Sequence, residues 1–268
     1  IENFLKDINI RITVFLAIND DIYRKPNLGL WEYLETIINV DKTNSFFVGD
    51  AAGRVYSNTY KDFSDSDYKF AVNIGIEFKT PQQFLNIPDK YKHIEINTLP
   101  FQQLKNLNSL HSFIPKNNNN IELIILVGLP CVGKTRFKNN FFKKYISLNG
   151  DTKNDINYVS KNITSHSIII DNCNHVLKKR QVFIEIAKQN NIDIRCFYFN
   201  IDKQLALHLN NYSMKINNCL KKSKITFTNI EKKMEIPKYE EGYKSIEFVN
   251  FVPCFTNSDY EKLFYQHS

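Results

Sequence analysis

Apolar residues in the second half of the chain form short continuous runs, and each run is followed by a segment of helical spacing. The continuous runs predict buried strands at residues 121–127, in the stretch that ends before Asp171, and at residues 192–200. Helical spacing predicts helices at residues 134–145, 176–189 and 205–215. Strands and helices that alternate in this way are typical of a parallel, doubly wound α/β sheet.

The first half of the chain shows the same alternation. Strands are predicted at Arg11–Ile18 and Ser45–Asp50, a breaker-rich loop at Asp21–Gly29, and a helix at Leu30–Val40. Residues 91–120 are polar, lack periodicity and contain four consecutive Asn, which is typical of a linker. We therefore predict two doubly wound α/β domains, at residues 1–90 and 121–268, joined by a linker at 91–120.

Composition narrows the class of protein only slightly. The chain has 268 residues and 43% hydrophobic content, and no apolar stretch reaches the ~18 residues of a membrane span. Its five cysteines form no C-x-x-C pair, so we expect reduced thiols in an intracellular protein, cytoplasmic or nuclear, without a structural disulfide or zinc. A net charge of +7 mildly favours a polyanionic partner, with surface solvation as the alternative.

The strand at residues 121–127 leads into a G-x-x-x-x-G-K-[ST] motif formed by Gly128, Gly133, Lys134 and Thr135. Glycines allow backbone N–H groups to approach a phosphate, and the following helix points its positive end at the same place. Lys134 can reach the β- and γ-phosphates of ATP, and the Thr135 hydroxyl can ligate Mg²⁺. A chance match is the alternative, but the flanking strand and helix predict a nucleotide site.

Acidic residues follow several predicted strands. Asp171 closes the second strand of the second half, where P-loop proteins place a metal-binding acid. Asp50 closes an earlier strand, and Asp62, Asp65 and Asp67 follow it. Carboxylates gathered at a strand end suit Mg²⁺, but acids after strands are also common solubilising residues. The pattern leaves both interpretations open.

The first half contains YRKPNLGLW, FFVGDAAGR and KDFSDSDYKFAVNIGIEFKTPQQF. From about Phe4 to Leu85 it resembles the phosphatase half of polynucleotide kinase 3′-phosphatases, a haloacid-dehalogenase-type domain. The resemblance implies that Lys25 neutralises the transferring phosphate, and that Asp50 and Asp67 hold Mg²⁺.

The part of the chain that resembles the phosphatase does not include the nucleophile of that family. The family carries it in a D-x-D-G-T block that lies upstream of the matching residues, and no such block occurs in this chain. The chain begins at Ile1 rather than Met, and we expect it to be part of a longer one. Without a nucleophile no covalent intermediate forms, so we expect no 3′-phosphatase turnover from the chain as given.

The second half resembles the kinase half of the same family, through the D-N-C-N block at Asp171 and the segment IPKYEEGYKSIEFVNFVPCF. The resemblance implies transfer of the ATP γ-phosphate to 5′-hydroxyl ends of DNA or RNA, with Asp151 as general base. The implied nucleotide-binding residues are Gly128, Pro130, Gly133, Lys134, Thr135, Arg136 and Lys215, and the implied metal ligands are Thr135 and Asp171.

The chain differs from the kinase family at residues 208–215, which correspond to the lid over the nucleotide, where the family carries arginines that bind the phosphates. This chain has none there; Lys215 can substitute as a point charge, and Arg180 and Arg195 are the nearest alternatives. Two other functions therefore stay open: a small-molecule P-loop kinase, and a nucleotide-binding scaffold without catalysis.

Overall fold

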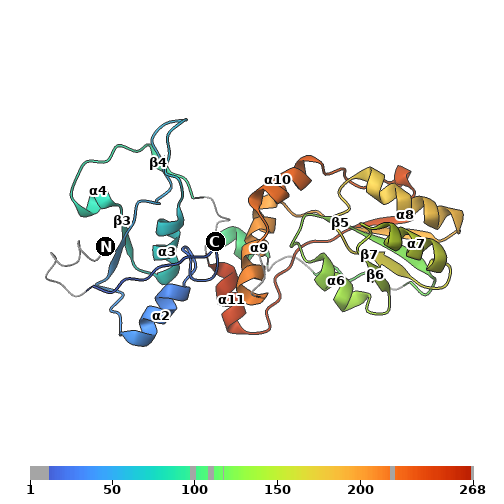
Figure 1. Cartoon of the computed structure of the whole chain (residues 1–268), viewed down its shortest axis with the longest axis horizontal. Coiled ribbons are helices and arrows are strands. Elements are labelled where there is room, and N and C mark those ends of the chain that lie inside the picture. Colours follow the sequence, from blue (N-terminus) through green and yellow to red (C-terminus); the bar gives the residue numbers. More distant parts are fainter. Residues whose placement is uncertain (1–11, 97–100, 108–111, 117, 218–220, 267–268) are drawn as a thin grey trace. The chain divides into compact units, whose positions relative to one another are not determined.

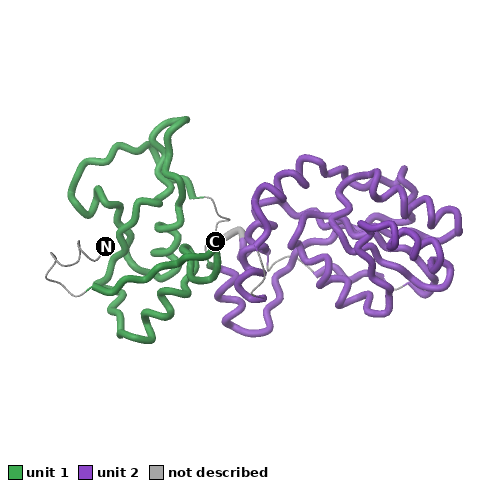
Figure 2. Tube along the Cα trace, in the orientation of Figure 1, with its two compact units in different colours: residues 1–98, 266–268 green, residues 99–265 purple. Residues whose placement is uncertain are grey.

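The structure is a computed structural model that describes residues 12–96, 101–107, 112–116, 118–217 and 221–266. It divides into two compact units, residues 1–98 with 266–268, and residues 99–265 (Figure 2). The division falls inside the segment predicted as a linker. Within that segment, β4 (His93–Ile94) pairs in the first unit and α5 (Phe101–Asn106) belongs to the second.

Among the described residues, the second unit is built on a five-stranded sheet whose strands all pair in parallel, in the order β6-β7-β5-β8-β9 (Figure 1). The strands are β5 (Glu122–Gly128), β6 (Ile146–Leu148), β7 (Ile168–Ile170), β8 (Asp193–Phe199) and β9 (Ser245–Phe248). The first strand, β5, lies in the centre, and the chain crosses from one side of it to the other between β7 and β8. Open α/β sheets bind ligands at the carboxyl ends of strands beside such a switch point.

Helices cover both faces of this sheet. They are α6 (Lys134–Phe141), α7 (Lys153–Asn162), α8 (Leu177–Gln189), α9 (Lys203–Asn217) and α10 (Lys224–Lys232). The last helix, α11 (Ser258–Tyr265), packs against α9, and a short 3₁₀ turn, η2, lies at Tyr239–Glu241. Because side chains alternate along a strand, Leu123 and Ile125 of β5 pack in the core formed with α7 and α8. Ile124 and Leu126 pack in the core formed with α6, α9 and α10. The prediction of a doubly wound sheet is confirmed for this unit.

The first unit has two small sheets. The strand β1 (Phe46–Val48) pairs in parallel with β3 (Glu77–Lys79), and β2 (Arg54–Val55) pairs antiparallel with β4. Its helices are α2 (Gly29–Ile37), α3 (Ser66–Ile74) and α4 (Pro81–Phe84). The core is small, with Leu28, Trp31, Phe70 and Ile74 buried together.

The prediction of a strand at Arg11–Ile18 is wrong for residues 12–18, the part of this segment that the structure describes. No strand forms there, and Ile12, Val14, Leu16 and Ile18 are 40%, 48%, 71% and 86% exposed. An apolar run records the tendency to be buried, but a strand also needs a neighbouring strand to satisfy its backbone groups. Among the described residues, the β1–β3 sheet offers this segment no pairing.

The structure bears on two expectations drawn from composition, those about membrane spans and about cysteines. In the described part of the chain, no helix is long and apolar enough to cross a membrane. The cysteines Cys131, Cys173, Cys196 and Cys254 are free thiols, whereas Cys219 lies outside the described residues.

Candidate active site

The phosphate loop joins the end of β5 to the start of α6. Gly133 is the N-cap of α6 with φ +94°, and a Cβ placed on it would meet no atom within 4 Å. A side chain at this position would therefore be strained and would project into open space above the loop. This open cradle at a helix N-terminus has the shape and polarity that a phosphate group requires, and so fits the predicted ATP.

Lys134 is held against the floor of the loop. Its side chain is buried, and Nζ donates to the carbonyl oxygens of Gly128 (3.0 Å) and Leu129 and lies 3.9 Å from Cys173 Sγ. Burial lowers the pKa of Lys134, and Cys173 and Asp171 act in the opposite direction. A buried ammonium with only carbonyl and thiol partners gains strongly from an anion.

Asp171 directly follows β7 and lies beside α6. Lys138 Nζ is 3.4 Å from Asp171 Oδ2 and also donates to Ser147 Oγ at 3.0 Å. Lys138 stands one helical turn after Lys134, so α6 presents both cations on one side. This second cation was not predicted from the sequence, although the i, i+4 spacing was visible.

The donor set for Mg²⁺ is small but of the right chemistry. Thr135 supplies an exposed hydroxyl at the start of α6, and Asp171 supplies a carboxylate. Among the described residues, no group of three or more His, Cys, Asp or Glu side chains could hold a metal ion. Mg²⁺ binds through one or two protein oxygens, with phosphates and water completing its shell, so these residues fit it.

Asp151 lies in the segment between β6 and α7, and two neighbours fix its carboxylate. Lys179 of α8 is 2.9 Å from Oδ1, and Asn172 Nδ2 donates to Oδ2 at 2.7 Å. The hydrogen bond from Lys179 lowers the pKa of Asp151, burial opposes it, and Asn172 lowers it further. Asp151 is therefore ionised near neutral pH, as a general base must be before it accepts a proton.

The loop after β7 connects Asp151 with the phosphate loop. Asn172 binds Asp151, and the next residue, Cys173, accepts a hydrogen bond from Gly128 N at 3.1 Å through its carbonyl oxygen. Asn174 has φ +43° and is buried; its Nδ2 donates to Leu126 O (2.7 Å) and Ile170 O (3.2 Å). Asn174 thus ties the ends of β5 and β7 together and fixes the loop that carries the site.

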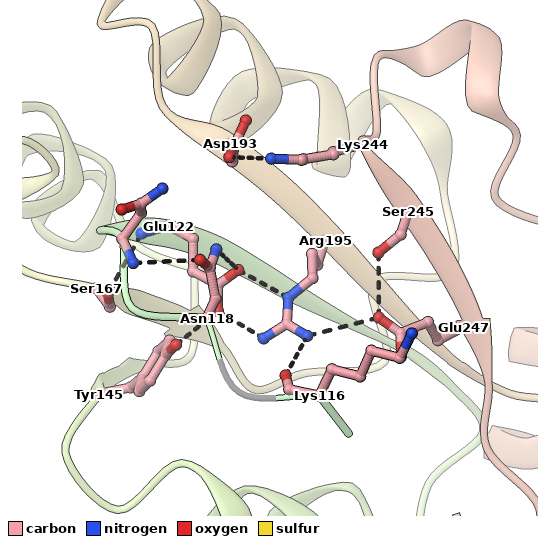
Figure 3. Close-up of polar contacts among 11 residues, drawn as sticks. Lys116, Asn118, Glu122, Tyr145, Ser167, Asp193, Arg195, Lys244, Ser245 and Glu247 are labelled. Atoms are coloured by element: carbon pink, nitrogen blue, oxygen red, sulfur yellow. Dashed lines mark hydrogen bonds and ion pairs between the residues drawn. The ribbon is translucent and has the colours of Figure 1, made fainter. Parts of the chain in front are cut away.

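Neither arginine considered as a lid substitute is available. Arg180 is completely buried and forms two hydrogen bonds with the Glu241 carboxylate, at 2.7 and 2.9 Å. Arg195 pairs in the same two-pronged way with Glu122, at 2.6 and 2.7 Å, and donates to Lys116 O (Figure 3). Glu122 is the first residue of β5 and Gly128 is the last, so the Arg195 pair lies at the edge of the sheet opposite the phosphate loop.

The other predicted nucleotide-binding residues differ in how they are placed. Arg136 follows Thr135 on α6 and donates to Cys254 O at 3.2 Å. Lys215 lies in the last turn of α9, a helix that contacts the loop where Cys131 Sγ donates to Asn210 Oδ1 at 3.5 Å. Pro130 belongs to the loop itself. The roles of these residues in nucleotide binding stay predictions.

The first unit brings its three predicted site residues to one pocket of about 920 Å³. Lys25 and Asp50 line it, and Asp67 forms an ion pair with Lys25 and accepts a hydrogen bond from Ala51 N at 3.1 Å through its second oxygen. The acid is thereby neutralised by a lysine that is 43% exposed. The roles of Lys25, Asp50 and Asp67 in phosphate or metal binding stay predictions.

The remaining acids of this region also have cationic partners. Arg54 is buried and pairs with Asp62 at 2.8 Å and Asp89 at 2.7 Å, while Lys69 pairs with Asp65 at 3.0 Å. The two Arg54 pairs join β2 to the segment before α3 and to the segment after α4, whereas the Lys69–Asp65 pair lies within the first turn of α3. Their geometry assigns Asp62 and Asp65 to the architecture of the first unit.

A parallel sheet with a phosphate loop between its central strand and the next helix defines the class of the second unit, an α/β protein of the P-loop type. Residues 1–85 match the family described as polynucleotide kinase 3 phosphatase. The chain is 34% identical to a bifunctional polynucleotide phosphatase/kinase of Acanthamoeba polyphaga mimivirus, over 91% of this chain and 66% of that protein. A bifunctional polynucleotide phosphatase/kinase of Schizosaccharomyces pombe is 30% identical over 97% of this chain and 64% of its own length.

A third relative, the polynucleotide 3′-phosphatase ZDP of Arabidopsis thaliana, is 36% identical over 31% of this chain and 13% of its own length. The chain thus carries a polynucleotide kinase 3-phosphatase domain and is homologous over most of its length to the bifunctional polynucleotide phosphatase/kinases. It spans just under two thirds of the length of the two bifunctional relatives.

Proposed function

We propose that the second unit transfers the γ-phosphate of ATP to the 5′-hydroxyl end of DNA or RNA. One observation carries this proposal: the loop after β7 places the Lys134 cradle and Asp151 at the same edge of the sheet, through Asn172 on one side and Cys173 on the other. Phosphoryl transfer needs little more than a phosphate cradle, a cation and a base for the attacking hydroxyl.

The reaction follows from this placement. The Asp151 carboxylate accepts the proton of the acceptor 5′-hydroxyl, whose oxygen then bonds to the γ-phosphorus while the bond to the β–γ bridging oxygen breaks. ADP leaves with that electron pair. Lys134 stabilises the negative charge on the phosphates. Thr135 and Asp171 would hold Mg²⁺, which would supply further charge neutralisation at the phosphates.

The names of the relatives support a polynucleotide as the acceptor, since the bifunctional relatives are named polynucleotide phosphatase/kinases. The rival acceptor is a small molecule. A scaffold without catalysis is the third candidate, and it is favoured by the pairing of Arg180 and Arg195 with buried glutamates, which leaves Lys215 as the proposed lid cation.

Transfer of labelled γ-phosphate separates the three candidates. We expect label on 5′-hydroxyl DNA or RNA oligonucleotides and none on the same oligonucleotides that already carry a 5′-phosphate. Apparent affinity for the oligonucleotide should weaken as salt rises, because phosphate contacts release counterions. ATP binding without any transfer would support the scaffold, and a salt-insensitive KM would support a small-molecule acceptor.

A further inference from the structure

A pocket of about 360 Å³ opens beside Asp151, on the side of α8. Its wall is apolar and includes Ile156, Val182 and Phe183. The volume falls within the ~300–1,000 Å³ of pockets that bind small ligands. No phosphate-loop residue lines this pocket. Because the γ-phosphate belongs on the loop side of Asp151, this pocket is placed to hold the group that carries the attacking hydroxyl.

The pocket is lined by one carboxylate and two ammonium groups. Lys178 and Lys179 line it together with Asp151, which leaves one positive charge in excess. Apolar walls below a cationic rim match a nucleoside that bears a phosphate: its base and sugar contact apolar side chains, and its phosphate contacts the lysines.

The backbone explains why the cation beside Asp151 comes from α8. Gly150, which precedes Asp151, has φ +77°, and a Cβ on it would lie 2.7 Å from Ile170 Cγ2 and 3.0 Å from the Phe183 ring. The position therefore excludes a side chain of its own. Lys179 reaches Asp151 from across the pocket, and its ammonium uses one of three N–H donors on Oδ1.

On the basis of the proposed function, we infer that this pocket holds the 5′-terminal nucleoside of the acceptor, and that Lys179 bridges Asp151 and the phosphate on the 3′ side of that nucleoside. Lys179 then acts as a substrate-binding residue that also aims the base. A bound phosphate brings a negative charge to Lys179, which weakens its pull on the Asp151 carboxylate and restores basicity at the moment the hydroxyl arrives.

The inference predicts an energetic coupling between one side chain and one phosphate, so the test changes both. The acceptors are two 5′-hydroxyl oligonucleotides of the same sequence; one carries a neutral methylphosphonate at the first internucleotide linkage. For the unchanged chain, we expect the methylphosphonate to lower kcat/KM about tenfold to a hundredfold, the range of a charge-assisted hydrogen bond. For Lys179→Met, the same replacement should cost less than about threefold.

Control variants separate this contact from general charge effects. Lys179→Arg keeps the charge and should keep most of the methylphosphonate penalty. Lys161→Met removes an exposed lysine of α7 that does not line the pocket, and should show the full penalty of the unchanged chain. Equal penalties in Lys179→Met and the unchanged chain, or no penalty in the unchanged chain, would overturn the inference.

Failure of the proposed function gives a different result. If the unchanged chain labels no 5′-hydroxyl polynucleotide, kinase activity is wrong, and the same four-way comparison is made on equilibrium binding of the two fluorescently labelled oligonucleotides. Binding that loses its dependence on the first phosphate in Lys179→Met still supports the contact. Binding with the same dependence in both chains contradicts it.

Discussion

Each unit brings a lysine and aspartates together near the end of a strand, yet the two arrangements differ in what the lysine contacts. In the first unit, Lys25 pairs directly with Asp67 and is 43% exposed. In the second, Lys134 is buried against backbone carbonyl oxygens beneath an open glycine cradle. The first lysine is already neutralised by the protein, whereas the second is neutralised best by a ligand. Residue types alone do not distinguish the two; their partners do.

The largest expected effect is at Lys134. Lys134→Ala removes the buried cation from the cradle, and we expect γ-phosphate transfer to a 5′-hydroxyl oligonucleotide to fall about a thousandfold or more. Lys143→Ala, an exposed lysine just after α6, is the matched control and should stay near full activity. Labelling by the Lys134→Ala chain at the original rate would remove the distinction between the two lysines.

The second largest effect is expected at Asp151, where a substitution should lower turnover without changing ATP binding. Asp151→Asn keeps the size of the side chain but cannot accept the proton, so we expect turnover to fall about a hundredfold with ATP binding unchanged. Asp193→Asn, a partly buried acid that pairs with Lys244 at the start of β8, is the control. Single-turnover transfer and nucleotide titration measure the two properties separately; unchanged turnover would show that another group is the base.

The pH profile sharpens the comparison further. Lys179 lowers the pKa of Asp151, so the base stays ionised to lower pH than an isolated aspartate. Lys179→Met removes this effect and raises the pKa, and the acid limb of kcat/KM should therefore move to higher pH, by less than about 2 pH units. Burial lowers the pKa of His175 and Lys179 lowers it further, so the measurement is repeated with His175→Asn present. An acid limb that does not move would show that Lys179 does not act on the base.

The smallest expected effect is at the first unit. Because the chain contains no D-x-D-G-T block, we expect no phosphate release from a 3′-phosphate end, and Lys25→Ala should leave that background unchanged. Phosphate release is measured with and without Mg²⁺ and compared with a heat-inactivated sample. Release well above that background, sensitive to Lys25→Ala, would place a working phosphatase site in the first unit.

The sequence predicted the elements whose apolar side chains are buried, on both faces of a central strand or on one face of a helix. Residues 121–127, 176–189 and 192–200 correspond closely to β5, α8 and β8, because continuous or helically spaced apolar residues record that burial directly. The same logic gave a strand at residues 11–18, where the apolar run exists but the structure shows no partner strand for residues 12–18. The spacing of apolar residues indicates which segments favour burial, but it does not show whether a neighbouring strand is present to pair with them.

The site was predictable where one continuous segment builds it, and not where two elements meet. The phosphate loop is a single motif, whereas the pairs Lys138–Asp171 and Lys179–Asp151 join residues 33 and 28 positions apart. Lys179 lay in a Lys-Lys-Arg group that also fits a solvated surface. Arg195 was considered for the lid, but a signal pointed elsewhere: Glu122 and Arg195 are charged residues within two otherwise largely apolar strands, and buried charges need a partner of opposite sign.

The Arg180–Glu241 pair has a consequence for the order in which the chain folds during synthesis. Arg180 belongs to α8, whereas Glu241 is made 61 residues later. Until Glu241 leaves the ribosome, completing the α8 side of the sheet would bury an uncompensated guanidinium, which costs several kcal/mol. Chains usually fold from the N-terminus as they emerge. The α8 side of the second unit therefore waits until residue 241 is translated, and a ribosome that stalls before Glu241 would present an incompletely folded second unit to proteases.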